Sequence, residues 1–303
     1  MAMTLLRAAL TFAAATLARR PPAEALNATI AVDGLSVQRG VAYGPAPRQA
    51  MDVWRPQGTA AELPVVVFFY GGAWQSGRRQ DYRFVAATLA RRGMVVVVPD
   101  YRLFPQVRFP TFIEDAALAV AAVRREALAW GGDADRVFLA GHSAGAHIAA
   151  MLVLAPHFLA AVGEDRAHLA GMVGLAGPYD FLPILDEDIR AVFAPAADPR
   201  ETQPAAHVDG RNPPMLLLHG GADRICYPRN SLALAARVRA AGGAAEARIA
   251  SGVGHIGIVL GFAPLFRFRS SAVEDVAGFV LGDGSNLRCG AIKRPRNRSS
   301  VVL

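Results

Sequence analysis

The sequence predicts an α/β fold in which a mostly parallel, eight-stranded sheet is covered by helices on both faces. Short β-branched runs alternate with longer segments rich in Ala, Leu and Arg, as strands alternate with crossover helices. Unbroken apolar runs such as "VVVFFY" and "MVVVVP" are typical of strands buried on both faces, which parallel sheets contain. The 303 residues are enough for one large domain of this class.

The elements follow one another in a regular order. Eight strands are expected at residues 36–43, 51–55, 65–70, 94–99, 137–140, 172–175, 215–219 and 245–249. Helices with apolar residues three and four apart are expected at residues 81–92, 112–130, 144–154, 230–241 and 273–281. Residues 177–214, rich in Pro, Asp and aromatic residues, break the alternation. Their apolar side chains need a surface to pack on, so this insertion is expected to form a small cap.

The two ends of the chain differ in charge from the part between them. Of the formal charge of +7, residues 1–22 carry +3 and residues 284–303 carry +5, so the rest carries a net −1. A nucleic-acid-binding protein gathers basic residues on one folded face, so this class is excluded. We expect the sequence to divide into an N-terminal segment (1–35), an α/β domain that carries the chemistry (36–283) and a basic, disordered tail (284–303). A tail that tethers the protein to an anionic membrane surface is an open alternative.

The N-terminal segment bears on localisation. A short apolar run within residues 1–18 is followed by Arg19 and Arg20, and "AEA" at residues 23–25 has the form of a cleavage site. Because the arginines separate the run from that site, a helix in a cytoplasmic protein is favoured over an export signal. No apolar run reaches the ~20 residues that span a bilayer. Two cysteines cannot build a disulfide framework, so cysteine usage does not decide the compartment.

The stretch "VFLAGHSAGAHIAAMLVL" places a serine between a buried strand and a helix. Gly141 and Gly145 let the strand and the helix approach closely, so that Ser143 points outward at the carboxyl end of the sheet. A serine that served only as a helix cap would not need glycine on both sides. This context predicts a nucleophile elbow of the form G-x-S-x-G.

A nucleophilic serine needs a general base and an acid that orients the base. Asp223 follows the strand "MLLLHG" and His255 follows the next strand, so both are expected at the same sheet edge as the serine. Asp180 is a rival for the acid and His147 a weaker rival for the base. Asp100, which precedes the serine, is expected to anchor a loop through backbone or arginine contacts, and His142 and His219 are expected to be structural.

The glycines of "FFYGGAW" predict an oxyanion hole. They allow backbone N–H groups to face a cavity, and the predicted donors are Gly71, Gly72, Ala73 and Ala144. Neither H-E-x-x-H nor paired Cys-x-x-Cys spacing occurs, and no G-x-G-x-x-G opens a helix, so no metal and no cofactor are expected.

Together these motifs resemble the α/β-hydrolase superfamily, in particular the hormone-sensitive-lipase-like carboxylesterases with their prenylcysteine methylesterase and kynurenine formamidase relatives. The resemblance covers roughly residues 36–282. It is carried by "YGGAW", "PDYRLFPQVRFP", "GGDADRVFLAGHSAGAHIA", "GADRICYP" and "GVGHIG", which stand in the order of that superfamily. It implies a serine esterase that acts on a small-molecule ester without a cofactor, with Ser143, Asp223 and His255 as the triad.

Two positions depart from that pattern. Tyr70 stands where a histidine usually opens the oxyanion motif, so the hydrogen bonds that hold this loop must be made differently. Ala73 replaces a glycine, and its methyl group narrows the space for bulky tertiary-alcohol esters.

The expected activity is hydrolysis of short- to medium-chain esters through an acyl-enzyme. An aryl-formamidase or amidase with the same triad and a non-catalytic binding protein are the alternatives. Five side chains are candidates for an apolar substrate pocket: Tyr70, Trp74, Phe104, Phe181 and Phe193.

Overall fold

The computed structural model describes residues 26–27, 30–58 and 62–282. The predictions about the signal-like segment before residue 26 and about the basic tail from residue 284 therefore lie outside the described residues. Among the residues that the structure describes, no helix combines the length and the apolar character needed to cross a membrane.

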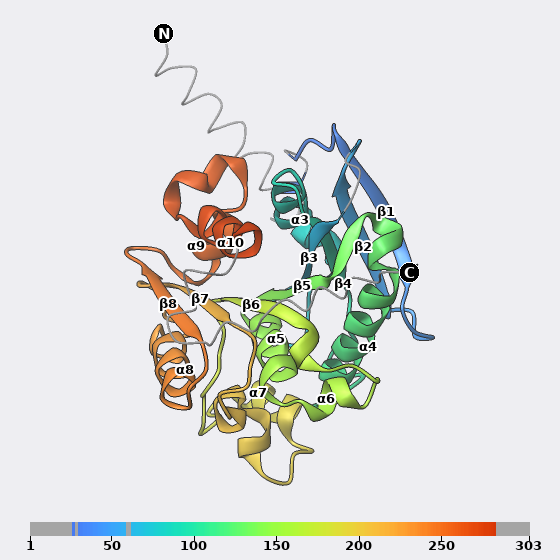
Figure 1. Ribbon diagram of the computed structural model, residues 1–303. Helices are drawn as coiled ribbons and strands as arrows, with labels where there is room; N and C mark the ends of the chain where they lie inside the picture. The colour runs from blue at the N-terminus through green and yellow to red at the C-terminus, as the bar shows by residue number, and fades with distance from the viewer. Residues whose placement is uncertain (1–25, 28–29, 59–61, 283–303) are drawn as a thin grey trace, which may run out of the picture.

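One sheet of eight strands runs through the domain (Figure 1). In space the strands stand in the order β1-β2-β4-β3-β5-β6-β7-β8. β2 is antiparallel to both of its neighbours, and all the other pairs are parallel. The strands are β1 (Leu35–Ala42), β2 (Ala50–Pro56), β3 (Leu63–Phe69), β4 (Val95–Pro99), β5 (Gly132–His142), β6 (Leu169–Leu175), β7 (Met215–Gly220) and β8 (Ala245–Ala250). This confirms the predicted fold class and all eight expected strands.

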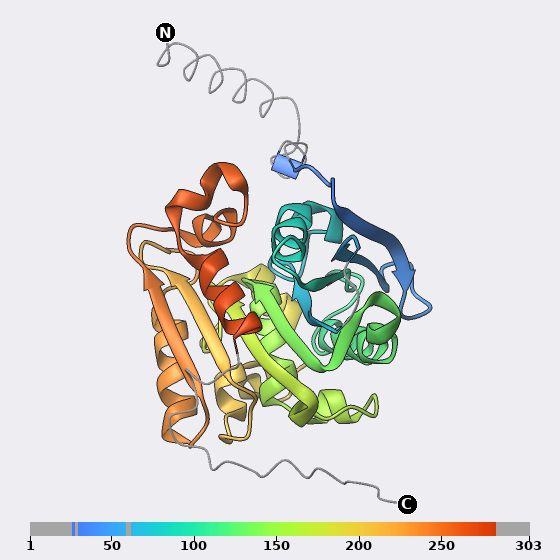
Figure 2. The same ribbon diagram turned by 45° about the horizontal axis from the view of Figure 1, so that its top comes forward.

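Helices cover both faces of the sheet (Figures 1 and 2). One face carries α3 (Arg83–Ala90), α9 (His255–Leu260) and α10 (Ala272–Leu281). The opposite face carries α4 (Thr111–Glu126), α5 (Ala144–Leu154), α6 (His157–Ala160) and α8 (Arg229–Ala240). Because both faces are covered, the central strands are buried along nearly their whole length, as their unbroken apolar sequences predict.

Some element boundaries differ from the expected ones. The helix expected at 81–92 is a 3₁₀ turn, η1 (Arg79–Tyr82), followed by α3, and the helix expected at 112–130 ends in a 3₁₀ turn, η2 (Ala127–Trp130). Helix α9 is not among the expected helices, because its six residues are too few to show a helical period.

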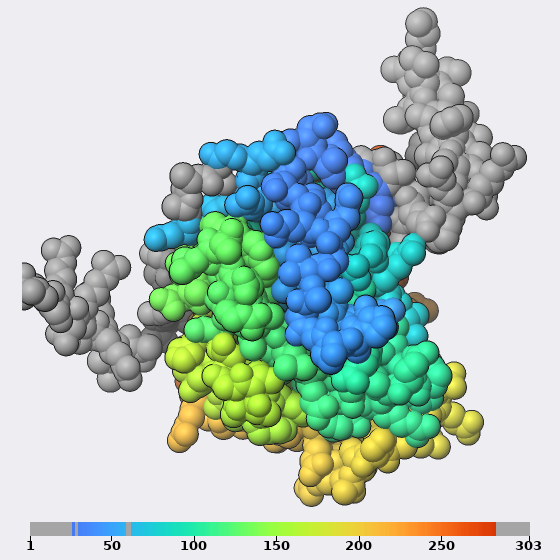
Figure 3. Space-filling model, turned by 90° about the vertical axis from the view of Figure 1, so that its right-hand side faces the viewer, coloured from blue at the N-terminus to red at the C-terminus, as the bar shows by residue number. Residues whose placement is uncertain are grey.

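The segment 177–214 packs on the same face of the sheet as α5. It contains α7 (Glu187–Phe193) and two 3₁₀ turns, η4 (Pro199–Thr202) and η5 (Pro204–His207). In Figure 3 it forms the yellow lower edge of the molecule, away from the blue β1–β2 hairpin. One further 3₁₀ turn, η3 (Arg166–His168), precedes β6, and another, η6 (Pro264–Arg269), follows α9. The role of 177–214 as a cap stays a prediction.

Candidate active site

The strand order places the loops after β3 and β5 side by side. β3 lies between β4 and β5, so the chain leaves it toward one side of the sheet and later returns on the other. Such a switch point opens a crevice at the carboxyl ends of the strands, where ligands bind in open α/β sheets. The loop that begins at Gly71 and the turn at Ser143 meet in this place, since a Cβ on Gly71 would lie 3.1 Å from Ser143 Cβ.

Ser143 occupies a strained turn between β5 and α5. Its φ of 54° and ψ of −121° are rarely adopted by a residue with a side chain. The close approach of the strand and the helix enforces this conformation: a Cβ on Gly145 would lie 2.0 Å from the Phe69 carbonyl oxygen. The turn therefore has the backbone of the predicted elbow, and the side chain of Ser143 is half-buried.

The structure brings Ser143, His255 and Asp223 together. Ser143 Oγ lies 2.9 Å from His255 Nε2, and His255 Nδ1 lies 2.8 Å from Asp223 Oδ2. The carboxylate can only accept, so Nδ1 carries the proton and the bare Nε2 accepts a hydrogen bond from the Ser143 hydroxyl. His255 is the first residue of α9, and both His255 and Asp223 are buried. This arrangement can take a proton from the serine.

Asp223 is held by further donors around it. Its Oδ1 accepts hydrogen bonds from the backbone N–H groups of Ile225 (2.9 Å) and Cys226 (3.0 Å). The nearby His219 has other partners: its Nε2 donates to the Cys226 carbonyl oxygen (2.7 Å), with Asp223 Oδ2 3.2 Å away, and its Nδ1 lies 2.8 Å from Ser231 Oγ. These buried contacts agree with the expected structural role of His219, which holds the loop that carries Asp223 through the Cys226 carbonyl. Burial raises the pKa of the neighbouring Cys226 thiol to about 12, so this thiol stays protonated at neutral pH.

The rival residues lie elsewhere or have other partners. Asp180 is exposed, and no hydrogen bond joins its carboxylate to His255. His147 is fully buried in α5, with Nε2 at 2.8 Å from the Thr202 carbonyl oxygen. Asp100 accepts a hydrogen bond from the Arg79 N–H and forms an ion pair with the Arg79 guanidinium, which confirms its predicted role as a loop anchor.

The loop at residues 71–77, which was predicted to supply the oxyanion hole and is called the oxyanion loop below, has an unusual backbone. Gly72, Ala73 and Trp74 have φ values of 136°, 54° and 60°. Among the described residues, the N–H groups of Gly72, Ala73 and Ala144 have no hydrogen-bond partner, which keeps them available as donors. The prediction that Gly71 is an oxyanion donor was wrong. Its N–H donates to the Tyr82 hydroxyl (3.1 Å) and so cannot face an oxyanion.

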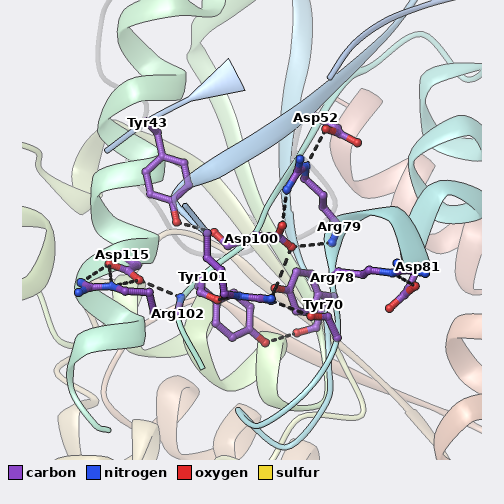
Figure 4. Close-up of polar contacts among 12 residues, drawn as sticks. Tyr43, Asp52, Tyr70, Arg78, Arg79, Asp81, Asp100, Tyr101, Arg102 and Asp115 are labelled. Carbon is purple, nitrogen blue, oxygen red and sulfur yellow. Dashed lines mark hydrogen bonds and ion pairs between the residues drawn. The ribbon is translucent and has the colours of Figure 1, made fainter. Parts of the chain in front are cut away.

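Tyr70, directly after β3, contacts the segments that flank this loop (Figure 4). Its side chain has no exposed surface and stacks on Tyr101 at 4.7 Å between ring centroids. Arg48 donates to the Tyr70 hydroxyl (2.7 Å), to the Gly77 carbonyl oxygen (2.7 Å) and to the Tyr101 carbonyl oxygen (2.8 Å). The hydrogen bonds that a histidine was expected to make are thus replaced by an arginine–tyrosine pair, and the prediction that Tyr70 lines the pocket was wrong.

Ion pairs fix the segments on both sides of Tyr70. Figure 4 shows Asp100 linked to Arg79 and Asp115 linked to Arg102. Burial, followed by the negative charge of Asp100, raises the pKa of Tyr70 well above its ordinary value, so the phenol stays neutral.

Three of the candidate pocket residues form one cluster with His147. The rings of Trp74, His147, Phe181 and Phe193 are mutual neighbours, with centroid distances from 4.8 Å to 6.1 Å. The cluster joins the oxyanion loop and α5 to the segment 177–214. The Phe104 ring lies apart from it, below the Arg108 guanidinium at 5.4 Å. Whether these rings bind a substrate stays a prediction.

Two buried histidines make stability depend on pH. Burial lowers the pKa of His142 to about 3 and that of His147 to about 4, against about 6.5 in an unfolded chain. Between these values the unfolded state binds more protons, so the free energy of unfolding is highest above about pH 6.5 and falls as the pH decreases toward 4. We expect His147→Gln to reduce this slope by up to about 1.4 kcal/mol per pH unit.

Urea unfolding from pH 8 to pH 4.5 measures this effect. The difference between wild type and variant at pH 8, where both histidines are neutral in either state, gives the packing cost of the substitution and is subtracted. Parallel curves for the two proteins would show that His147 does not titrate on unfolding.

Known esterases are similar to this chain in sequence and in fold. The chain is 28% identical over 283 residues to a probable isoprenylcysteine alpha-carbonyl methylesterase of Arabidopsis thaliana, which covers 86% of this chain and 59% of the relative. It is 32% identical over 223 residues to esterase LipC of Mycobacterium tuberculosis, which covers 67% of this chain and 55% of that protein. The chain thus spans between 55% and 59% of the length of these two relatives.

The apo form of Thermogutta terrifontis esterase 2 has the same fold. It superposes with a TM-score of 0.69 at 24% identity, over 86% of this chain and 97% of that chain. The expected α/β-hydrolase fold is therefore confirmed. The profile of the BD-FAE family matches residues 51–238, which contain β2 to α8 with both the elbow and the acid loop, and on this match the chain belongs to the BD-FAE family.

Proposed function

We propose that this protein is a serine carboxylesterase that hydrolyses short- to medium-chain esters through an acyl-enzyme. The observation that carries the proposal is the hydrogen-bond chain from Ser143 through His255 to Asp223 at a strained turn. A serine hydroxyl is a weak nucleophile at neutral pH, and such a chain activates it. The names of the two relatives, a methylesterase and an esterase, support the same class of reaction.

In the first half of the reaction, Ser143 Oγ attacks the ester carbonyl carbon. His255 Nε2 takes the hydroxyl proton, and Asp223 stabilises the imidazolium that forms. The tetrahedral intermediate then collapses: the bond to the alcohol oxygen breaks, and His255 gives its proton to the leaving alkoxide. The product is an acyl-serine and a free alcohol.

In the second half, a water molecule takes the place of the Ser143 hydroxyl as the nucleophile. His255 takes a proton from the water as its oxygen attacks the acyl carbon, and it returns this proton to Ser143 Oγ when the acyl bond breaks. The carboxylic acid leaves, and the resting hydrogen-bond chain from Ser143 to Asp223 forms again.

The negative charge of each tetrahedral intermediate needs donors that are already in place. The unpartnered N–H groups of Gly72, Ala73 and Ala144 are the candidates. Gly72 and Ala73 both have positive φ values, and successive N–H groups in turns of this kind can form an anion-binding concavity. Each such donor contributes roughly 10² to 10³ in rate where it has been tested.

The size of the aromatic cluster argues for a limited chain length. Trp74 and Phe193 are buried and in contact at 4.8 Å between centroids, so an acyl chain beside them meets a wall of packed rings. The Ala73 methyl group adds to the crowding close to the reacting carbonyl. We therefore expect acetate, butyrate and octanoate esters to react faster than laurate esters, and tertiary-alcohol esters to react poorly.

Hydrolysis of p-nitrophenyl acetate, butyrate, octanoate and laurate tests this proposal, with N-formylkynurenine measured in parallel. We expect kcat/KM to fall from octanoate to laurate, because the packed rings limit the chain. Asp180→Asn tests the rival candidate for the acid. It is expected to keep wild-type rates, because this exposed carboxylate has no part in the triad. If only the formamide reacts, the protein is a formamidase and not an esterase. If nothing reacts with the folded protein, the proposal that it is an enzyme is wrong.

A further inference from the structure

A second chain of hydrogen bonds runs behind the proposed triad. The Gly71 N–H donates to the Tyr82 hydroxyl oxygen (3.1 Å), and that oxygen lies 3.1 Å from His142 Nδ1. His142 Nε2 lies 3.1 Å from the backbone carbonyl oxygen of His255. Through Tyr82 in η1, these hydrogen bonds therefore join three separate segments: the oxyanion loop after β3, the elbow at the end of β5 and the start of α9, which carries the proposed base.

The direction of every proton in this chain follows from its two ends. The His255 carbonyl can only accept, so His142 Nε2 carries the proton. A neutral imidazole has a single N–H, so Nδ1 is bare and the Tyr82 hydroxyl must donate to it. The Tyr82 oxygen is then free to accept from the Gly71 N–H. Burial, followed by the charge of His255, lowers the pKa of His142 to about 3, which is consistent with a neutral ring.

Among the described residues, the Tyr82 hydroxyl and the His142 ring have no other hydrogen-bond partner. His142 is 2% exposed, and its ring centroid lies 5.0 Å from that of His255. A Cβ added to Gly71 would lie 3.0 Å from both His142 Nδ1 and the His142 carbonyl oxygen, so the loop rests directly on this residue. The Tyr82 ring is held by Phe68 at 5.6 Å and by Tyr70 at 5.9 Å. A buried donor or acceptor without a partner raises the free energy of the folded state. Loss of one of these hydrogen bonds is therefore expected to disrupt the others.

We propose that Tyr82 and His142 are positioning residues that hold the oxyanion donors and the general base in register with each other. Tyr82 fixes the Gly71 N–H, so the next peptide, which carries the Gly72 N–H, can turn only about the Gly71 dihedrals. His142 fixes the His255 carbonyl at the start of α9, where the imidazole is attached. Neither residue touches the substrate. The inference rests on the proposed function of Ser143 and His255.

The neutral state of His142 has a consequence for the proposed reaction. His255 becomes an imidazolium in each half-reaction, and a charged ring at 5.0 Å would oppose this. The neutral His142 adds no such charge, yet it still donates to the His255 carbonyl. Loss of the Tyr82 hydroxyl would allow the other tautomer of His142, in which a bare Nε2 faces that carbonyl and the hydrogen bond is lost.

We expect Tyr82→Phe to lower kcat about 10- to 100-fold while KM changes less than twofold, because misplacement of catalytic groups by a fraction of an ångström has effects of this size. Tyr43→Phe is the matched control. Like Tyr82→Phe it removes a tyrosine hydroxyl, but the Tyr43 hydroxyl donates to the Asp100 carbonyl oxygen, so the hydrogen bonds behind the triad stay intact. His142→Gln keeps one donor and one acceptor, so it should retain more of kcat than His142→Leu, which keeps neither.

A measurement without substrate tests the chain independently. Long-range ¹H–¹⁵N spectra of histidine-labelled protein distinguish protonated from bare ring nitrogens, and His142→Gln assigns the signal among the seven histidines. We expect one tautomer of His142 in the wild type, protonated at Nε2, and a mixture of tautomers in Tyr82→Phe.

The two measurements separate the possible failures. A wild-type His142 protonated at Nδ1, or a Tyr82→Phe variant that loses no more kcat than Tyr43→Phe, would overturn the inference. If the wild type lacks esterase activity, the proposed function fails, while the tautomer of His142 in the wild type and in Tyr82→Phe still decides whether the chain exists.

Discussion

Replacing Ser143 with alanine is expected to lower kcat for p-nitrophenyl butyrate by about 10⁴ to 10⁶. The alanine variant has no oxygen to form the acyl-enzyme, and the His255 Nε2 at 2.9 Å then has no hydroxyl to deprotonate. What remains is catalysis by binding and by the oxyanion donors, which is small by comparison. The rate is measured by release of p-nitrophenolate under saturating substrate.

A phosphonate probe provides a control that does not depend on turnover. It should add its mass to the peptide that contains Ser143 in the wild type and leave Ser143→Ala unlabelled. Ser251→Ala, in an exposed turn, should label and react like the wild type. Full activity of Ser143→Ala in protein free of contaminating esterase would show that another group is the nucleophile.

Gly145→Ala is expected to destabilise the folded protein by about 3 kcal/mol or more. The added Cβ would lie 2.0 Å from the Phe69 carbonyl oxygen and 2.5 Å from that of Tyr70. These are backbone atoms at the end of the central strand β3, which cannot move aside as a side chain can. The helix must shift instead, and the turn that holds Ser143 shifts with it. Thermal unfolding should show a loss of roughly 6 °C or more, together with loss of esterase activity.

Gly278→Ala in α10 is the matched control. It makes the same chemical change within a helix, but a Cβ at Gly278 meets no atom within 4 Å. Alanine has a better helix propensity than glycine, so this variant should gain about 0.5–1 kcal/mol in stability. Opposite signs for the two variants would isolate the contact with β3, whereas a stable Gly145→Ala protein would contradict the tight elbow.

The fold and the three residues of the proposed triad could be predicted because their signals are local. β-Branched runs specify buried strands, and the glycines around Ser143 specify a tight strand-to-helix turn. Asp223 and His255 follow consecutive strands of a parallel sheet, whose carboxyl ends share one edge. Short elements such as α9 were missed, because six residues contain too few turns for a periodic pattern.

The sequence by itself determined the sheet, its crossover helices, and which three residues of the proposed triad meet at its carboxyl edge. Only the tertiary structure decided which polar groups support them: Arg48 at Tyr70, the Ile225 and Cys226 N–H groups at Asp223, and Tyr82 between Gly71 and His142. It also decided that the Gly71 N–H points away from the proposed oxyanion site. The physical reason is that a hydrogen bond depends on distances of about 3 Å and on direction. Between residues far apart in the chain, these are set by packing and leave no periodic trace in the sequence.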